Sequence, residues 1–245
     1  MGVSREMTGR FRKTAYAAGA LYLLTFVSIP NLALYGPVLD PKYIVGTGSD
    51  TGVFFGAILD IVVALAGIGT AVVLFPVVKR QNEALALGFV GSRVLEAAMI
   101  FGGVMFLLSL VTLRQSGIGA GGLVTAHTLV ALYDQTLLVG QSFMPAVNAL
   151  LLGSLLYQSR LVPRVLPMLG FIGAALLVTT DVAKLFELVG PISPAAVLAA
   201  LPIALWEFSL GVWLVVKGFK QSPLLAGDMR DSGVDRSLAR AASAR

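Results

Sequence analysis

Long apolar runs, separated by short polar segments, recur along the whole chain. Each run is continuously apolar over roughly 20 residues, the length at which an α-helix crosses a bilayer. No run alternates apolar and polar residues with a period of two, so the pattern indicates helices and excludes the strands of an outer-membrane barrel. The sequence therefore predicts an all-α, polytopic transmembrane bundle of six spans, over residues 14–34, 52–78, 84–113, 131–157, 165–185 and 195–216.

The segments between the runs are rich in glycine, proline and charged residues. Residues 35–51 and the glycine-rich residues 114–126 are predicted loops, and residues 79–83 form a very short turn. Residues 124–133 are apolar but too short to span, so either an interfacial or a re-entrant helix fits them. The predicted organisation is a basic cytoplasmic N-terminus (1–13), a six-helix transmembrane domain (14–219) and a disordered cytoplasmic tail (220–245).

Lysine and arginine gather on alternate connections. With the N-terminus in the cytoplasm, fourteen of the 18 basic residues lie in cytoplasmic segments, whereas the outside loops hold only Lys42 and Arg114. This asymmetry obeys the positive-inside rule and predicts that both termini are cytoplasmic. The first run follows basic residues, as a signal peptide does, but it is longer than a signal-peptide core and no small-x-small cleavage site follows it. We therefore expect an uncleaved span, with Tyr35, Tyr43 and Tyr133 in the outer aromatic belt.

Composition agrees with a lipid environment. Hydrophobic residues make up 57% of the chain and charged residues only 13%, about half the share in soluble domains. The chain has no cysteine and a single histidine, His127, which excludes disulfides, thiolate metal sites and histidine-cluster metal sites. The net charge of +5 belongs to the cytoplasmic segments and does not indicate nucleic-acid binding. We expect the lipid bilayer as partner, no metal and no cofactor, and leave open a homo-oligomer or a membrane partner.

Ionisable side chains inside the apolar runs are the leading functional candidates, because each costs several kcal/mol at bilayer depth unless it is paired or hydrated. Arg93 and Glu96 are three residues apart, which places them on one helix face. Asn148 and Glu207 lie near the middle of two other runs, and Asp60 lies about 12 Å from the outer end of its own. One hypothesis is that these five residues form a polar centre that carries a proton or ion, or holds a polar substrate. The alternative is a structural ion pair of Arg93 with Glu96 or Glu207 that sets helix register.

A second group of ionisable residues lies near the predicted outer boundary. Asp181 and Lys184 are three residues apart, late in the fifth run, and are expected to be solvated at the interface, where lysine snorkels. His127 and Asp134 lie near the outer end of the fourth run. We expect His127 to be solvated there as well, with sensing of the outside pH as the alternative.

Three classes of function remain. The first is a small carrier, channel or proton-linked protein that uses the central acids. The second is a non-catalytic membrane partner or sensor subunit with a structural ion pair. An intramembrane enzyme has the least support, because one histidine and no cysteine leave only carboxylate chemistry. Pro145 and Pro202 predict kinks beside Asn148 and Glu207, which are compatible with a cavity.

Four short motifs carry a family resemblance: residues 93–98 (RVLEAA), 159–164 (SRLVPR), 191–194 (PISP) and 201–207 (LPIALWE). With them the chain resembles domain-of-unknown-function family 4386, a family of bacterial multi-span membrane proteins, over about residues 9–220. The resemblance implies a multi-pass protein of the bacterial cytoplasmic membrane. It implies no activity and assigns no role to any residue.

Overall fold

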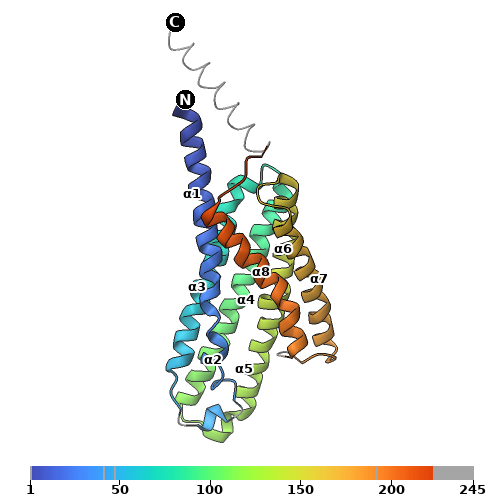
Figure 1. The fold of residues 1–245 in the computed structure, drawn as a ribbon. Helices are drawn as coiled ribbons and strands as arrows, with labels where there is room; N and C mark the ends of the chain where they lie inside the picture. The colour runs from blue at the N-terminus through green and yellow to red at the C-terminus, as the bar shows by residue number, and fades with distance from the viewer. Residues whose placement is uncertain (1, 41, 47, 191–192, 223–245) are drawn as a thin grey trace.

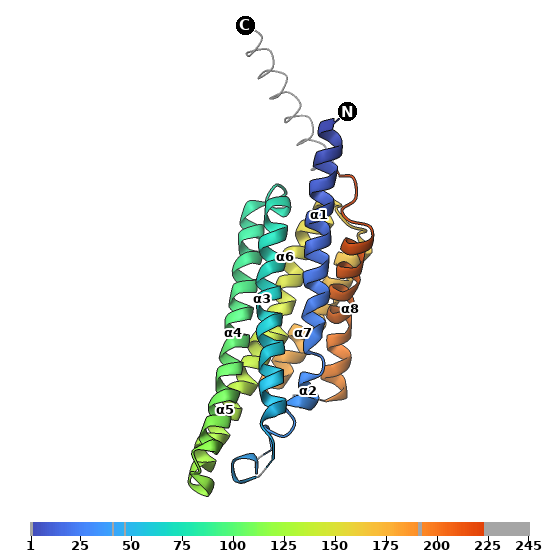
Figure 2. The same ribbon diagram turned by 90° about the vertical axis from the view of Figure 1, so that its left-hand side faces the viewer.

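The computed structural model describes residues 2–222 except 41, 47 and 191–192, without the side chains of residues 2–8, 10 and 32. In this part of the chain every regular element is helical. Most of the predicted disordered tail, residues 223–245, lies outside the described residues. Figures 1 and 2 show a single bundle of long helices that run up and down beside one another.

The bundle is built from helices of very different lengths. Two 3₁₀-helices, η2 (Tyr43–Val45) and η3 (Gly119–Gly122), lie in the loops at one end of it. The α-helices are α1 (Gly2–Leu24), α2 (Asn31–Leu34), α3 (Thr51–Val78), α4 (Glu83–Gln115), α5 (Leu123–Thr136), α6 (Met144–Ser159), α7 (Val165–Leu185) and α8 (Pro194–Val216).

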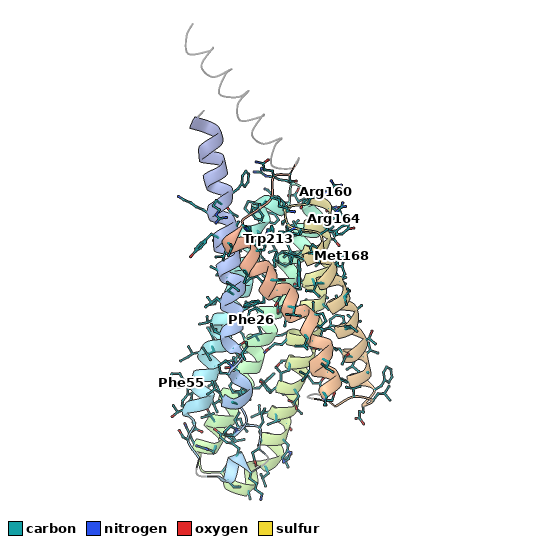
Figure 3. The ribbon with its side chains drawn as sticks, in the orientation of Figure 1. Phe26, Phe55, Arg160, Arg164, Met168 and Trp213 are labelled. Carbon is teal, nitrogen blue, oxygen red and sulfur yellow. The ribbon has the colours of Figure 1, made fainter. Side chains whose placement is uncertain are left out.

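Within the described residues, five helical segments are long and apolar enough to cross a membrane: α3, α4, the continuous segment Gly119–Ser159, α7 and α8. Large apolar side chains such as Phe55 and Met168 are exposed on the outer surface, which suits a lipid solvent (Figure 3). The chain is therefore an all-helical integral membrane protein. The predicted spans for α3, α4, α7 and α8 agree with the observed helices to within two residues at each end.

Capping residues define several helix ends. The Asn82 side chain accepts a hydrogen bond from the Leu85 amide at 3.0 Å, so α4 begins at Glu83. The Ser193 hydroxyl accepts from the Ala196 amide at 3.2 Å, and Pro194 opens α8. Helix α6 ends at Arg160, whose backbone adopts the left-handed conformation with φ of 55°.

The first predicted span is wrong as a single helix. Helix α1 already begins at Gly2 and ends at Leu24, and a 3₁₀-helix, η1 (Thr25–Ser28), and the short helix α2 follow. The hydroxyl groups of Thr25 and Ser28 donate to backbone carbonyls three residues earlier, and Pro30 has no N–H to continue an α-helix. The apolar run is continuous, but its helix is broken.

The fourth predicted span also needs correction, because its helix begins before residue 131. Residues 124–133 belong to α5, which continues into α6, so they form neither a separate interfacial helix nor a re-entrant one. Between α5 and α6 the chain forms a π-helix, η4 (Leu137–Phe143). Pro145 cannot donate to the carbonyl of Gln141, and the wider π turn lies directly before it.

The two ends of the bundle differ in charge. The end that holds the N-terminus also holds the turns 79–82 and 160–164, and we call it the basic end (Figure 1). Arg160 and Arg164 lie together there in Figure 3. Arg12 donates to the carbonyls of the last two residues of α8, which joins α1 to α8 at this end. We call the opposite end, with α2 and residues 35–50, the loop end.

Glycines allow a close contact between α1 and α8. A Cβ atom at Gly19 of α1 would lie 2.6 Å from the Gly211 carbonyl oxygen of α8. Only glycine at this crossing lets the two backbones approach so closely. Helix α1 therefore packs against α8 along the same stretch that brings Tyr22 to the centre of the bundle.

Candidate functional site

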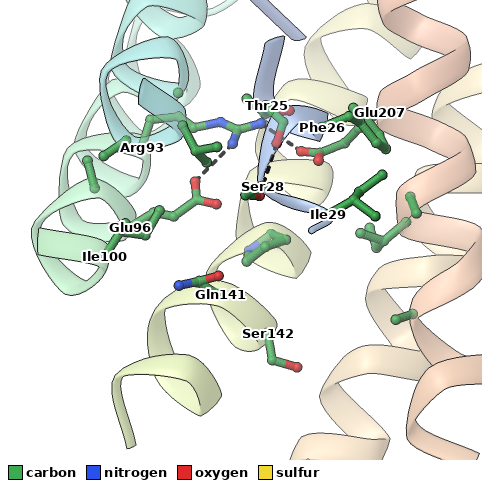
Figure 4. A pocket seen from close by; sticks show the side chains of 18 of the residues that line it. Thr25, Phe26, Ser28, Ile29, Arg93, Glu96, Ile100, Gln141, Ser142 and Glu207 are labelled. Carbon is green, nitrogen blue, oxygen red and sulfur yellow. Dashed lines mark hydrogen bonds and ion pairs between the residues drawn. The ribbon is translucent and has the colours of Figure 1, made fainter. Parts of the chain in front are cut away.

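Arg93 of α4 is the centre of a buried ionic cluster and is only 3% exposed. Its Nη1 lies 2.9 Å from Glu96 Oε2, one turn further along α4. Its Nη2 lies 2.7 Å from Glu207 Oε1 of α8. Figure 4 shows the guanidinium between the two carboxylates, which approach it from different helices.

Neutral side chains complete this cluster. Arg93 Nη2 also donates to the Tyr22 hydroxyl at 3.2 Å, which adds α1 to the network. Asn148 of α6 donates to Glu96 Oε2 at 2.7 Å, and Ser92 donates in turn to Asn148 Oδ1. The structure thus brings together Arg93, Glu96, Asn148 and Glu207, four of the five residues of the predicted polar centre, from three helices.

The cluster carries more negative than positive charge. Arg93 supplies one positive charge, whereas Glu96 and Glu207 supply two carboxylates. Among the described residues, no other lysine, arginine or histidine forms an ion pair with either acid. An excess charge inside an apolar bundle is costly, so this site favours the uptake of a proton or a cation.

A cavity of about 280 Å³ opens beside the cluster. Arg93, Glu96 and Glu207 form part of its wall. The broken segment η1 contributes Thr25 and Ser28 to the wall, and the π-helix η4 contributes Gln141 and Ser142 (Figure 4). The two irregular helical segments of the fold therefore meet at the charged centre.

Asp60 lies apart from this cluster and forms its own. Its Oδ1 accepts from Asn31 Nδ2 at 2.6 Å, and its Oδ2 accepts from the Tyr35 hydroxyl at 2.8 Å. The same Asn31 amide also reaches the Gly56 carbonyl at 3.2 Å. The prediction that Asp60 belongs to one centre with Arg93 is not what the contacts show, because its partners come from α2 and the residue after it.

A second cavity, of about 450 Å³, lies at Asp60 toward the loop end. It is lined in part by Asn31, Tyr35, Tyr133 and Asp134. Four residues line both cavities: Ser28, Ile29, Gln141 and Ser142. The two cavities therefore adjoin, with η1 and η4 between the Asp60 cluster and the Arg93 cluster.

Of the residues predicted at the outer boundary, Asp181 is not solvated but buried, with 2% of its surface exposed. Its Oδ1 lies 3.0 Å from Lys184 Nζ and accepts from the Ser142 hydroxyl at 2.6 Å. Asp181 turns toward η4 because helix α7 packs this face against the π-helix. His127 and Asp134 are exposed and line a third cavity, of about 250 Å³, near the loop end.

The predicted outer tyrosine belt is wrong for all three tyrosines. Tyr35, Tyr43 and Tyr133 are 2%, 6% and 4% exposed, so their rings lie inside the protein instead of facing lipid headgroups. Tyr35 and Tyr133 pack edge to face with ring centroids 5.9 Å apart. Hydroxyl-bearing rings meet Asp60 and Asp50 here, and these hydrogen bonds favour the buried positions.

A paired carboxylate outside the spans serves as a reference for these sites. Asp50, directly before α3, lies 2.7 Å from Arg114 Nη2 and accepts from the Tyr43 hydroxyl and the Gln115 amide. Partial burial acts to raise the pKa of Asp50, but these hydrogen bonds and the Arg114 charge outweigh it and hold that pKa below 3.8. Burial and the bond to Asp50 raise the pKa of Tyr43 above 10.0.

Several residues of the two clusters were not among the sequence candidates. Tyr22, Asn31, Tyr35, Ser92 and Ser142 each hydrogen-bond one of the predicted polar residues. Each is a polar group within or beside an apolar run, which is a weak signal. The sequence pattern does not say which of the many such groups face an acid.

Among the described residues, no group of three or more histidine, aspartate or glutamate side chains is placed to hold a metal ion. The two acids of the Arg93 cluster converge on a guanidinium.

Comparison with known proteins identifies the family. Searches among curated proteins and among solved structures find no match to this chain. The sequence model of one family, described as Domain of unknown function (DUF4386), matches residues 17–218. This match covers every residue of both clusters, and it agrees with the resemblance carried by the motifs around Arg93 and Glu207. The chain therefore belongs to the DUF4386 family.

Proposed function

We propose that this protein moves protons across a membrane through the Arg93–Glu96–Glu207 cluster, as a small proton-linked carrier. The observation that carries the proposal is that two carboxylates share one guanidinium beside a cavity. One of the two acids is therefore left without a full counter-charge. Glu207, whose side chain is 17% exposed, lies on the cavity side and is the acid that we assign to bind and release the proton.

The electrostatics of the cluster support this assignment. Arg93 and Glu96 are fixed to each other on one helix, and Asn148 holds Glu96 with a further hydrogen bond. Among the described residues, Glu207 has only the Arg93 guanidinium as a hydrogen-bond partner, and it lies on a different helix. A proton on either acid removes the excess negative charge. A proton on Glu96 also weakens the two hydrogen bonds that its Oε2 accepts from Arg93 and Asn148, because a neutral carboxyl group is a poorer acceptor than a carboxylate.

The irregular helices support a transport role. In membrane carriers, broken helices are tolerated where they line a cavity, and they commonly form the binding site. Here η1 breaks the first apolar run and η4 widens the fourth, and both line the cavity at Arg93. A purely structural salt bridge requires neither feature.

We further propose six spans with both ends in the cytoplasm of a bacterial cell. Helix α1 with η1 and α2 then makes the first span, because α1 packs along α3 and α8 inside the bundle. The arginines and lysines of the basic end support a cytoplasmic location for that end. The membrane is then the bacterial cytoplasmic membrane.

Proton uptake into proteoliposomes tests the proposal. The purified protein is reconstituted with a pH-sensitive dye inside, and a potassium gradient with valinomycin supplies the driving force. We expect wild-type protein to acidify the lumen and Glu207→Gln to slow this uptake by about tenfold or more, because the amide cannot carry the proton. The matched control is Glu83→Gln, an exposed glutamate at the start of α4, which is expected to behave like wild type.

Two outcomes contradict the proposal. Either wild-type vesicles take up protons no faster than empty vesicles, or Glu207→Gln and Glu96→Gln both keep the wild-type rate. Both results favour the alternative, a non-catalytic membrane partner or sensor subunit in which the cluster holds α1, α4 and α8 in register.

A further inference from the structure

The larger cavity, at Asp60, has the size and lining of a small-molecule site. Its volume of about 450 Å³ falls in the usual range for ligand pockets. Apolar side chains such as Leu39, Leu137 and Leu138 make up much of its wall. Polar side chains line it as well, among them Asp60 with its partners Asn31 and Tyr35, and also Asp134, Gln135 and Lys184.

Asp60 is a buried carboxylate that lacks a cation. It is 4% exposed, and both of its oxygens accept hydrogen bonds from neutral donors. Among the described residues, no lysine, arginine or histidine forms an ion pair with it. Lys184 lines the same cavity, but its ammonium group pairs with Asp181. Each oxygen of Asp60 therefore has a hydrogen-bond donor, but its negative charge has no counter-charge among the described residues.

An unpartnered acceptor lies next to this carboxylate. Asn31 is 8% exposed and lines the cavity. Its amide nitrogen donates hydrogen bonds to Asp60 Oδ1 and to the Gly56 carbonyl, and these two acceptors set the orientation of the amide group. Its carbonyl oxygen Oδ1 is buried without a hydrogen-bond partner. A buried acceptor of this kind costs about 1–3 kcal/mol unless something donates to it.

Aromatic rings line the same wall. Tyr35 and Tyr133 are in edge-to-face contact, and both line the cavity. Ring faces attract cations and also pack against apolar groups. Carboxylate, free carbonyl oxygen and rings together match an ammonium group that is attached to an apolar body.

We propose that this cavity binds an organic ammonium ion, with its N–H groups donating to Asp60 and to Asn31 Oδ1. An inorganic cation fits less well, because it requires a shell of several oxygens and leaves the apolar part of the cavity empty. This assignment goes beyond proton movement at Arg93 and does not depend on it. The two sites share walls but no ionisable residue.

Binding of benzylammonium chloride tests the assignment. Isothermal titration calorimetry of the purified protein in detergent measures the binding affinity. We expect benzylammonium to bind, and neutral benzyl alcohol to bind with an affinity at least about tenfold lower. Asp60→Asn is expected to weaken benzylammonium binding by about tenfold or more, because it removes the counter-charge. Glu83→Gln, at an exposed site far from the cavity, is expected to keep the wild-type affinity.

A second variant covers the case in which Asp60→Asn does not fold. Tyr35→Phe keeps the ring but removes a donor that competes for Asp60 Oδ2. Benzylammonium is then expected to bind at least as tightly as to wild type, and a tenfold loss contradicts the proposal. The elution profile in size-exclusion chromatography shows which variants are folded.

Three results overturn the assignment. Equal binding of benzyl alcohol shows that the cavity selects apolar bodies and ignores charge. Wild-type affinity in a folded Asp60→Asn variant shows that the carboxylate is not the counter-ion. The third result compares two salts at the same ionic strength. If sodium chloride displaces benzylammonium and choline chloride does not, the site binds an inorganic cation. The titrations need no proton gradient, so they succeed or fail independently of the proton uptake experiment.

Discussion

Two buried carboxylate sites lie in adjoining cavities, and they differ in their source of positive charge. At Arg93 the cation is part of the chain, and it joins α1, α4 and α8. At Asp60 the partners are a neutral amide and a neutral hydroxyl from the short segment around α2. The difference teaches that an acid in a membrane bundle has to be interpreted together with its counter-charge.

The two sites also differ in how their walls are built. The Arg93 cluster is held by four helices, α1, α4, α6 and α8, around an arginine that is 3% exposed. The Asp60 site depends on Asn31 and Tyr35, which come from the broken end of the first apolar run. We therefore expect removal of charge to cost more at Arg93 than at Asp60.

The largest expected effect comes from Arg93→Leu. It leaves Glu96 and Glu207 buried without a cation, which is expected to lower the free energy of unfolding by about 3–5 kcal/mol. Unfolding by urea in detergent micelles, followed by circular dichroism, measures the change. Arg93→Lys, which keeps the charge but loses the forked geometry, is expected to recover only part of it.

Asp60→Asn is the matched change at the other site. Its amide oxygen still accepts from Tyr35, but its NH2 group then faces the Asn31 amide nitrogen, which loses an acceptor. No cation is left behind, so a loss of about 1–3 kcal/mol is expected, smaller than at Arg93. Equal losses for Arg93→Leu and Asp60→Asn would remove the proposed distinction between the two sites. A loss at Asp60 that exceeds the loss at Arg93 would reverse it.

An effect smaller than that of Arg93→Leu is expected from Gly56→Ala, which tests how firmly Tyr35 is held against Asp60. A Cβ atom at Gly56 would overlap the Tyr35 ring, so the ring must move away from the carboxylate. The expected cost is about 1–3 kcal/mol, as for other overpacked cores. The control is Gly91→Ala on α4, where nothing lies within 4 Å of an added Cβ and a slight gain is expected. Equal stability of the two variants contradicts a firmly packed Asp60 site.

Most of the fold follows from hydropathy, and its exceptions have local causes. The long helices α3, α4, α7 and α8 coincide with uninterrupted apolar runs, because lipid forces such runs to satisfy their backbone internally. The break at η1 was missed because Thr25 and Ser28 barely lower the hydropathy of their run. Pro145 predicts a distortion in the fourth run. It does not specify whether the helix kinks or forms a π-helix, because either can accommodate the N–H that proline lacks.

The candidate site was predictable only where its contacts are local. The pairing of Arg93 with Glu96 follows from their spacing on one helix. The contact with Glu207 joins residues 114 positions apart, so it depends on how α4 and α8 face each other. Asp60 is predicted as a fifth member of the centre from its depth in the membrane. Depth does not specify which side of α3 the residue faces, and in the structure its side chain contacts Tyr35 instead.

The smallest expected effect is that of a substitution at Asp50, outside the predicted spans, which provides a reference for the two buried sites. Asp50 pairs with Arg114 of α4 at the loop end of the bundle, where both side chains keep some exposure to solvent, which weakens an ion pair. Asp50→Asn is therefore expected to cost about 1 kcal/mol or less at neutral pH. Because folding lowers the pKa of Asp50 below 3.8, its contribution to stability is complete well above that value and is lost as the pH falls through it toward the folded pKa.

Thermal unfolding in detergent between about pH 3 and pH 6 measures this effect. Wild-type protein is expected to lose more stability over that range than Asp50→Asn, because only the wild type has this carboxylate to protonate. If both lose the same amount, the acid sensitivity belongs to other carboxylates, and the Asp60 and Arg93 clusters become the first places to look. A difference confined to Asp50 shows instead that the buried acids keep their charge state over this range, which is the condition under which the two sites can be compared at neutral pH.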